Sequence, residues 1–176
     1  MGHPFKHFAT VFRHRRAVIR NCARAGIFWQ GLRHDLSKYS PSEFLPSAHY
    51  YQGTRSPNVA ERLEKGCSRA WMHHKGRNRH HFEYWTDYDP NTHRMEPVEM
   101  PRKYLIEMFC DRVAASKIYQ KDAYTDRSPL EYFEKSKATR VIHPVTSEKI
   151  EKLLTMLAEK GEAETFAYIR AHKHDL

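Results

Sequence analysis

Helical spacing of apolar residues runs through most of this chain and limits what it can fold into. Between Pro4 and Ala25, apolar side chains recur every three or four residues, and Gly26 follows as a natural end for a helix. The alternation of apolar and polar residues that is typical of half-buried strands is almost absent. The sequence therefore predicts an all-α protein.

Helix-start signals recur further along the chain. Ser40-Pro41-Ser42-Glu43 offers a capping serine, a proline at the first helical position and Glu43 as the acid of a capping box. Ser128-Pro129-Leu130-Glu131 repeats this pattern. Pro101 is expected to open another helix, which carries an apolar stripe through Ile118.

The other segments complete an all-helical prediction. Residues 57–85 indicate one long helix, or two helices separated by a kink, because Gly66 and Gly76 weaken the pattern. Residues 86–99 are polar and predict an irregular surface loop. Residues 146–172 predict one or two amphipathic helices, broken near Gly161. These helices can cover the core or form an oligomer interface.

Length and composition favour one compact domain. The chain has 176 residues, of which 40% are hydrophobic, enough for a single core. We expect one domain over residues 1–176, with a core at about 4–120 and a C-terminal helical extension at about 121–176. No apolar run approaches the roughly 18 residues of a membrane span, and the N-terminus lacks the apolar centre of a signal peptide. Three widely separated cysteines predict no disulfide framework, which fits a reducing cytoplasm.

The net charge of +9 favours a phosphorylated or polyanionic partner. A phosphorylated small molecule, a nucleotide or a nucleic acid would meet this description. The alternative is a solvated basic surface, since lysine and arginine are scattered along the chain.

Histidine is the unusual residue of this composition. The chain contains 13 histidines, several of them in internal doublets that an expression tag would not explain. His73-His74 and His80-His81 are seven residues apart, a spacing that returns to the same face of a helix after two turns. Only one histidine of each doublet can easily face inward. We favour His74 and His81 over His73 and His80, although the latter pair also shares a face.

Two aspartates complete a candidate metal-binding set. Asp35 follows His34 directly, and Asp111 interrupts an apolar helical stretch where a carboxylate needs a cation or strong donors. The alternative for Asp111 is a structural pair with Arg77. Neutral imidazoles and carboxylates are ligands for iron, manganese and zinc. The candidate ligands to one or two divalent transition-metal ions are His14, His34, Asp35, His74, His81 and Asp111.

The order of these residues resembles that of the HD-domain superfamily of metal-dependent phosphohydrolases. The resemblance covers about the first two-thirds of the chain and includes the Leu32 to Lys38 segment, where Ser37 replaces the superfamily's usual glycine. It implies an HD-like helical core in which His14, His34-Asp35 and Asp111 bind a first metal. The histidines between them would bind a second metal, and one aspartate could bridge the two. The spacing from His14 to His34 is short for the superfamily, so His7 is a rival first ligand.

The whole chain also resembles a bacterial and phage family known only as a domain of unknown function. The segments that carry this likeness are 34–44, 70–85 and 100–111. This second resemblance implies no activity.

These observations predict a metal-dependent hydrolase of phosphoesters, with a nucleotide as one candidate substrate. By the superfamily resemblance, Lys38 would face the substrate phosphate. Arg77 offers a bidentate fork for phosphate oxygens, or else lies on an exposed polar face. Glu43 is a candidate general base, or an acid that supports a metal ligand from behind, although its capping-box role already explains it. Glu107 is a candidate residue for orienting a ligand histidine or else a surface residue.

Two other functions fit the same sequence. Some superfamily members use a di-iron centre to activate oxygen, which makes an oxygenase the alternative enzyme. A nonenzymatic basic module would instead bind nucleic acid or a protein partner, with salt-sensitive affinity.

Overall fold

The protein is described here by a computed structural model that covers residues 2–175. The predominance of helix predicted from the apolar spacing is confirmed. The α-helices are α1 (Pro4–Arg24), α2 (Phe28–Arg33), α3 (Pro41–His49), α4 (Pro57–Lys65), α5 (Arg69–Arg77), α6 (Arg102–Gln120), α7 (Ser128–Glu134) and α8 (Pro144–His172). The shorter elements are the 3-10 helices η1 (Leu36–Tyr39), η2 (Phe82–Tyr84), η3 (Lys121–Ala123) and η4 (Lys137–Thr139), and the strands β1 (Thr86–Asp89) and β2 (Arg94–Pro97).

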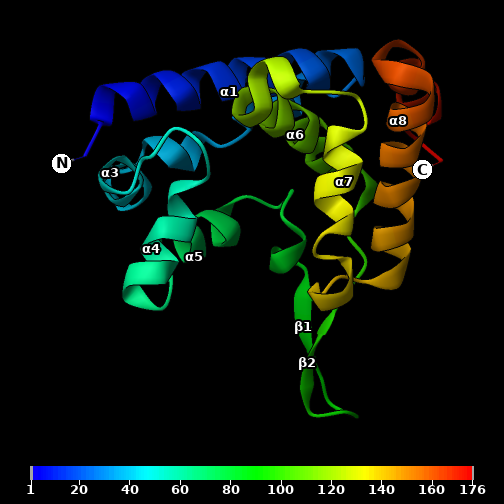
Figure 1. The fold of residues 1–176 in the computed structure, drawn as a ribbon. Coiled ribbons are helices and arrows are strands. Elements are labelled where there is room, and N and C mark those ends of the chain that lie inside the picture. Colours follow the sequence, from blue (N-terminus) through cyan, green and yellow to red (C-terminus); the bar gives the residue numbers. More distant parts are fainter. Residues whose placement is uncertain (1, 176) are drawn as a thin grey trace.

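The long helix α1 organises the arrangement of the others (Figure 1). It packs against α2 and α6, and α6 in turn packs against α8. Helices α3, α4 and α5 lie together under one end of α1, while α7 and α8 lie under the other end. The antiparallel β1–β2 hairpin projects away from α1 (Figure 1).

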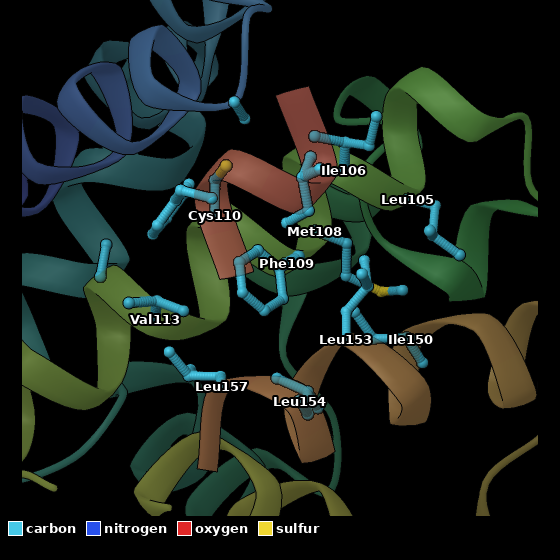
Figure 2. Packing of buried hydrophobic residues seen from close by; sticks show 14 of the residues in the cluster. Leu105, Ile106, Met108, Phe109, Cys110, Val113, Ile150, Leu153, Leu154 and Leu157 are labelled. Carbon is cyan, nitrogen blue, oxygen red and sulfur yellow. The ribbon is translucent and has the colours of Figure 1, made fainter. Parts of the chain in front are cut away.

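The hydrophobic core lies where α1, α6, α7 and α8 meet. Leu153, Leu154 and Leu157 of α8 pack against the apolar side of α6 around Phe109 (Figure 2). The Phe109 ring is fully buried and contacts Phe166 edge-on, with ring centroids 5.6 Å apart. The C-terminal helices therefore belong to the same core as the N-terminal ones.

The middle of the chain differs in two ways from the single long helix and the loop that the sequence predicted. Residues 57–85 follow the alternative of two helices, α4 and α5, divided at Gly66, but α5 ends at Arg77 and η2 follows it. Gly66 ends α4 in a left-handed conformation at φ +75°, which favours glycine because it has no Cβ. Residues 86–99 contain the β1–β2 hairpin rather than an irregular loop.

The capping box predicted at the start of α3 does not form. Ser40 occupies the N-cap position, but its side chain makes no capping hydrogen bond. The Glu43 carboxylate contacts His73 and His74 instead. By contrast, the predicted break in the C-terminal helix is present, because Gly161 has a non-helical backbone inside α8.

Candidate metal centre

Four side chains from three separate segments form the first half of a buried cluster. His14 comes from α1, His34 and Asp35 follow α2, and Asp111 comes from α6. His14 Nε2 lies 3.0 Å from Asp111 Oδ1, and His34 Nε2 lies 3.1 Å from Asp35 Oδ2. His14 Nε2 and Asp35 Oδ2 are 3.8 Å apart. These potential ligand atoms all lie within 4.8 Å of one another.

The second half of the cluster surrounds the other oxygen of Asp35. Oδ1 of Asp35 lies 3.3 Å from His74 Nε2 and 3.5 Å from His80 Nε2. His81 belongs to the same group, and its ring centroid lies 4.1 Å from that of His80. Asp35 thus directs one carboxylate oxygen to each half of the cluster.

Glu107 fixes the orientation of two imidazoles. Its Oε1 lies 2.9 Å from Nδ1 of His34 and 3.2 Å from Nδ1 of His80. The Gln30 amide donates to Oε2 of the same carboxylate at 2.6 Å. Because Nδ1 is occupied, each ring presents Nε2 to the cluster. Glu107 is buried, so the surface alternative for this residue is wrong.

Glu43 plays a similar part for His74. Its Oε2 lies 2.8 Å from His74 Nδ1, and Oε1 lies 2.6 Å from His73 Nδ1. Asn78 and Ser37 complete the surroundings of the His74 ring. Glu43 therefore positions His74 from behind.

Several ligand atoms of the cluster are buried without a hydrogen bond. Among the described residues, Nε2 of His14, His34, His80 and His81 and Oδ1 of Asp35 have no hydrogen-bond partner. The short contacts among them lack the alignment that a hydrogen bond needs. Unsatisfied buried polar atoms are costly, and so many in one place are unusual in a folded protein.

The donor set fits a transition metal. Metal–nitrogen bonds of about 2.0–2.1 Å place neighbouring ligand atoms about 3.0–3.4 Å apart in common coordination geometries. The contacts of 3.0, 3.1 and 3.3 Å in the cluster match this spacing. Imidazole nitrogen and carboxylate oxygen also suit iron, manganese and zinc. The residues present can therefore hold a metal ion.

Electrostatic coupling holds the carboxylates ionised. Burial alone would raise the pKa of Asp35, but His34, Lys38 and His74 hold it well below its usual range. Burial would likewise lower the pKa of His34, but Asp35, Glu107 and Asp111 raise it to about 10. The pKa of Glu107 falls to about 2 because its contacts with His34 and His80 outweigh its burial. Acidic and basic groups thus stabilise each other inside this cluster.

The backbone of Asp35 is itself unusual. This residue has φ +54° and ψ 27°, a left-handed conformation that costs energy for most side chains but is less rare for aspartate. Such conformations concentrate at functional sites. Here the turn places His34 and Asp35 in the same cluster although they are adjacent in sequence.

A cavity of about 560 Å³ opens onto the cluster. His14, His74, His81 and Asp111 line it. Its other walls come from α1, α3, α4, α6 and the region of α7, so it lies between the two groups of helices beneath α1 (Figure 1). This volume is in the range of small-molecule binding sites.

The structure places the remaining candidate residues as follows. Lys38 lines the cavity, and its Nζ lies 2.5 Å from Asp35 Oδ2. His7 also lines the cavity, but its ring packs on Phe44 and Tyr51 outside the cluster, so His14 and not His7 belongs to the group of potential ligands. Arg77 is exposed and absent from the cavity wall. This agrees with the alternative of an exposed polar face for Arg77. Its suggested pairing with Asp111 is wrong, since among the described residues the ion pairs of Asp111 are with histidines.

His80 belongs to the cluster although the sequence favoured His74 and His81 over His73 and His80. Helical spacing allows one inward histidine in each doublet, but α5 ends at Arg77 and the chain is extended at Asn78. Both His80 and His81 then reach the cluster. Asn78 is a common turn residue, and its position before the second doublet was the available signal of a helix end.

Comparison with known protein families gives one match. The sequence model of a family of unknown function, DUF5662, matches residues 3–156. The chain belongs to this family. Searches among curated proteins and among solved structures give no match. In this DUF5662 protein, the matched range includes every residue of the cluster described above. Within residues 2–175, none of the helices has the length and apolar character needed to span a membrane.

Proposed function

We propose that this DUF5662 protein is a metal-dependent phosphohydrolase whose centre holds two divalent ions bridged by Asp35. The observation that carries the proposal is the set of buried, unpartnered ligand atoms on either side of that carboxylate. The order of these residues along the chain, with its likeness to the HD-domain superfamily, also supports it.

The two halves of the cluster define two ligand groups. His14, His34, Asp35 and Asp111 would hold one ion, while Asp35, His74, His80 and His81 would hold the other. Bound divalent ions would lower the pKa of water and withdraw charge from a phosphoryl oxygen. Glu107 and Glu43 keep the imidazoles in the orientation that such binding requires.

In this proposal Lys38 would contact a substrate phosphate. Its ammonium group lines the cavity beside Asp35 and is held there by that carboxylate. An ammonium at this point stabilises negative charge that develops on phosphoryl oxygens. The cavity is large enough to hold a nucleotide or a phosphorylated metabolite of similar size.

Elemental analysis of the purified protein, combined with a phosphatase assay, tests the proposal. We expect between one and two equivalents of iron, manganese or zinc per chain, and hydrolysis of phosphomonoesters. The variant His34→Ala should lose both. The matched control is His172→Ala, since His172 is exposed at the end of α8 and outside the cluster.

The same experiment separates the proposal from its rivals. Less than about half an equivalent of any transition metal, after anaerobic preparation and reconstitution, would contradict a metal enzyme. Iron with oxygen consumption and without hydrolysis would identify an oxygenase. Salt-sensitive binding of nucleic acid that survives in the double variant His34→Ala, Asp35→Ala would identify a nonenzymatic module.

A further inference from the structure

Two arginines on the wall of the cavity lack acidic partners. Arg112 follows Asp111 on α6, and Arg140 follows η4; both line the same cavity as the metal cluster. Among the described residues, neither has a carboxylate oxygen within 4.0 Å. The Nε of Arg112 and one terminal nitrogen of Arg140 are buried without hydrogen-bond partners. Buried arginine is ordinarily paired, so these free donors need an explanation.

Phe133 holds the two guanidinium groups in place. The Arg140 guanidinium lies 4.1 Å from the centroid of the Phe133 ring, and that of Arg112 lies 5.5 Å from it. Arg140 also donates to the Phe133 carbonyl at 2.8 Å and to Ser136 Oγ at 2.5 Å. Stacking and these bonds position both forks while leaving N–H groups free.

The acids near the pair do not bond to it. Glu83 interacts with both guanidinium groups and Asp111 with that of Arg112, but among the described residues neither carboxylate lies within 4.0 Å of them. Two acids of the wall are engaged elsewhere, since Glu43 contacts His73 and His74 and Asp111 contacts His14. A cavity with spare guanidinium donors is suited to an oxyanion, which accepts two hydrogen bonds from one arginine fork.

We propose that Arg112 and Arg140 form an anion-binding subsite, so that the substrate carries a second anionic group besides the phosphate that is hydrolysed. The second group is a carboxylate or a further phosphate, since both present oxygen pairs to guanidinium groups. The substrate class rests on the proposed phosphohydrolase function. The anion subsite does not, because it is defined by the arginines alone.

Titration of the purified protein with sulfate by calorimetry tests the subsite without any reaction. The double variant Arg112→Gln, Arg140→Gln should raise the sulfate Kd by at least about tenfold, the loss expected for charge-assisted hydrogen bonds. The matched control is Arg127→Gln, because Arg127 is exposed just before α7 and outside the cavity wall. Unchanged sulfate affinity in the double variant would overturn the subsite, as would sulfate binding that disappears only in His34→Ala.

A second variant guards against a folding defect. Arg112→Lys keeps the positive charge beside Phe133 but removes the fork, so it should weaken sulfate binding while circular dichroism and metal content stay unchanged. Wild-type affinity in a folded Arg112→Lys protein would contradict a role for that fork.

Hydrolysis of a designed substrate series tests the substrate class. Alkyl phosphates that end in a hydroxyl, a carboxylate or a second phosphate, on chains of increasing length, would be compared by kcat/KM. We expect an anionic end to raise kcat/KM at least about tenfold at one length, and Arg112→Gln, Arg140→Gln to abolish the preference. The preferred end identifies the second anionic group as a carboxylate or a phosphate.

Equal kcat/KM for the hydroxyl series and the anionic series would overturn the inference about the substrate. If no substrate is hydrolysed, the proposed function is overturned, and the sulfate titration alone decides the anion subsite.

Discussion

Glu107 illustrates how one buried carboxylate can set the chemistry of two imidazoles. Because it contacts Nδ1 of both His34 and His80, it directs both Nε2 atoms to the cluster. In Glu107→Gln, an amide would have to face two ring nitrogens with one acceptor. We expect metal affinity to fall about 10–100-fold, as for other residues that orient metal ligands. Competition with a fluorescent chelator measures this change.

The matched control for Glu107 is Glu99→Gln. Glu99 is exposed, forms its ion pair among the described residues with Lys149, and is not part of the cluster. Its substitution should leave metal affinity within about twofold, since exposed pairs contribute little. If the metal affinity of Glu107→Gln equals that of Glu99→Gln, the imidazoles of His34 and His80 need no acid to orient them.

The sequence left two interpretations of Arg77, a phosphate contact or an exposed polar face. The Arg77 side chain is exposed on α5. We therefore expect Arg77→Gln to leave KM for a phosphomonoester within about twofold, as for surface substitutions away from a site. Steady-state kinetics decide this point. A tenfold rise in KM would restore Arg77 to the site.

At the scale of elements, apolar spacing predicted the helices well where a single face is buried. The expected helices at residues 4–25, 101–118 and 146–172 correspond to α1, α6 and α8. Apolar spacing did not predict the end of the helix between α5 and the hairpin. The reason is that His80 in this segment is buried against carboxylates rather than in an apolar core. The six expected ligands do meet in one cluster, but His81 arrives from a turn and not from the helical face that predicted it.

The ion pairs of Glu162 connect three helices near the kink in α8. Its carboxylate contacts Arg24 of α1 at 2.5 Å and also Lys117 of α6. We expect Glu162→Gln to lower the free energy of unfolding by about 1 kcal/mol at pH 7, the scale of a partly exposed pair. Urea unfolding measures it, with Glu164→Gln as the control because Glu164 is exposed and its Lys160 contact is 3.9 Å long.

The effect of Glu162 should depend on pH. Burial would raise the pKa of Glu162, but Lys117 and Arg24 hold it below its ordinary value of 4.5. A carboxyl group with a depressed folded-state pKa stabilises the protein fully above its unfolded pKa and loses that contribution as the pH falls through the folded pKa. The difference between wild type and Glu162→Gln should therefore shrink below pH 4.5. A difference that stays constant in acid would exclude the charge as its cause.

At the scale of the whole molecule, the hydrophobic core and the cluster of histidines and carboxylates lie on two sides of α6. Phe109 enters the core with α8, while Glu107 and Asp111 reach the cluster. The cluster joins α1, the segment after α2, α5 with the turn that follows it, and α6. Helices α3 and α5, which supply no residue to the hydrophobic core cluster, are attached to the rest of the protein partly through these polar contacts.

Metal removal should consequently destabilise the whole protein. A ligand that binds only the folded state stabilises it by about 2.7 kcal/mol at a free concentration of 100 times its Kd. For a domain of this length, that corresponds to a decrease of roughly 5–10 °C in Tm when a chelator removes the metal. Differential scanning calorimetry of the metal-loaded and chelator-treated protein measures the shift. His34→Ala should show no such shift, because it has no metal to lose. If the chelator removes the metal from the wild-type protein and Tm stays the same, the ions do not stabilise the folded state. The unpartnered atoms of the cluster must then have hydrogen-bond partners other than a metal ion.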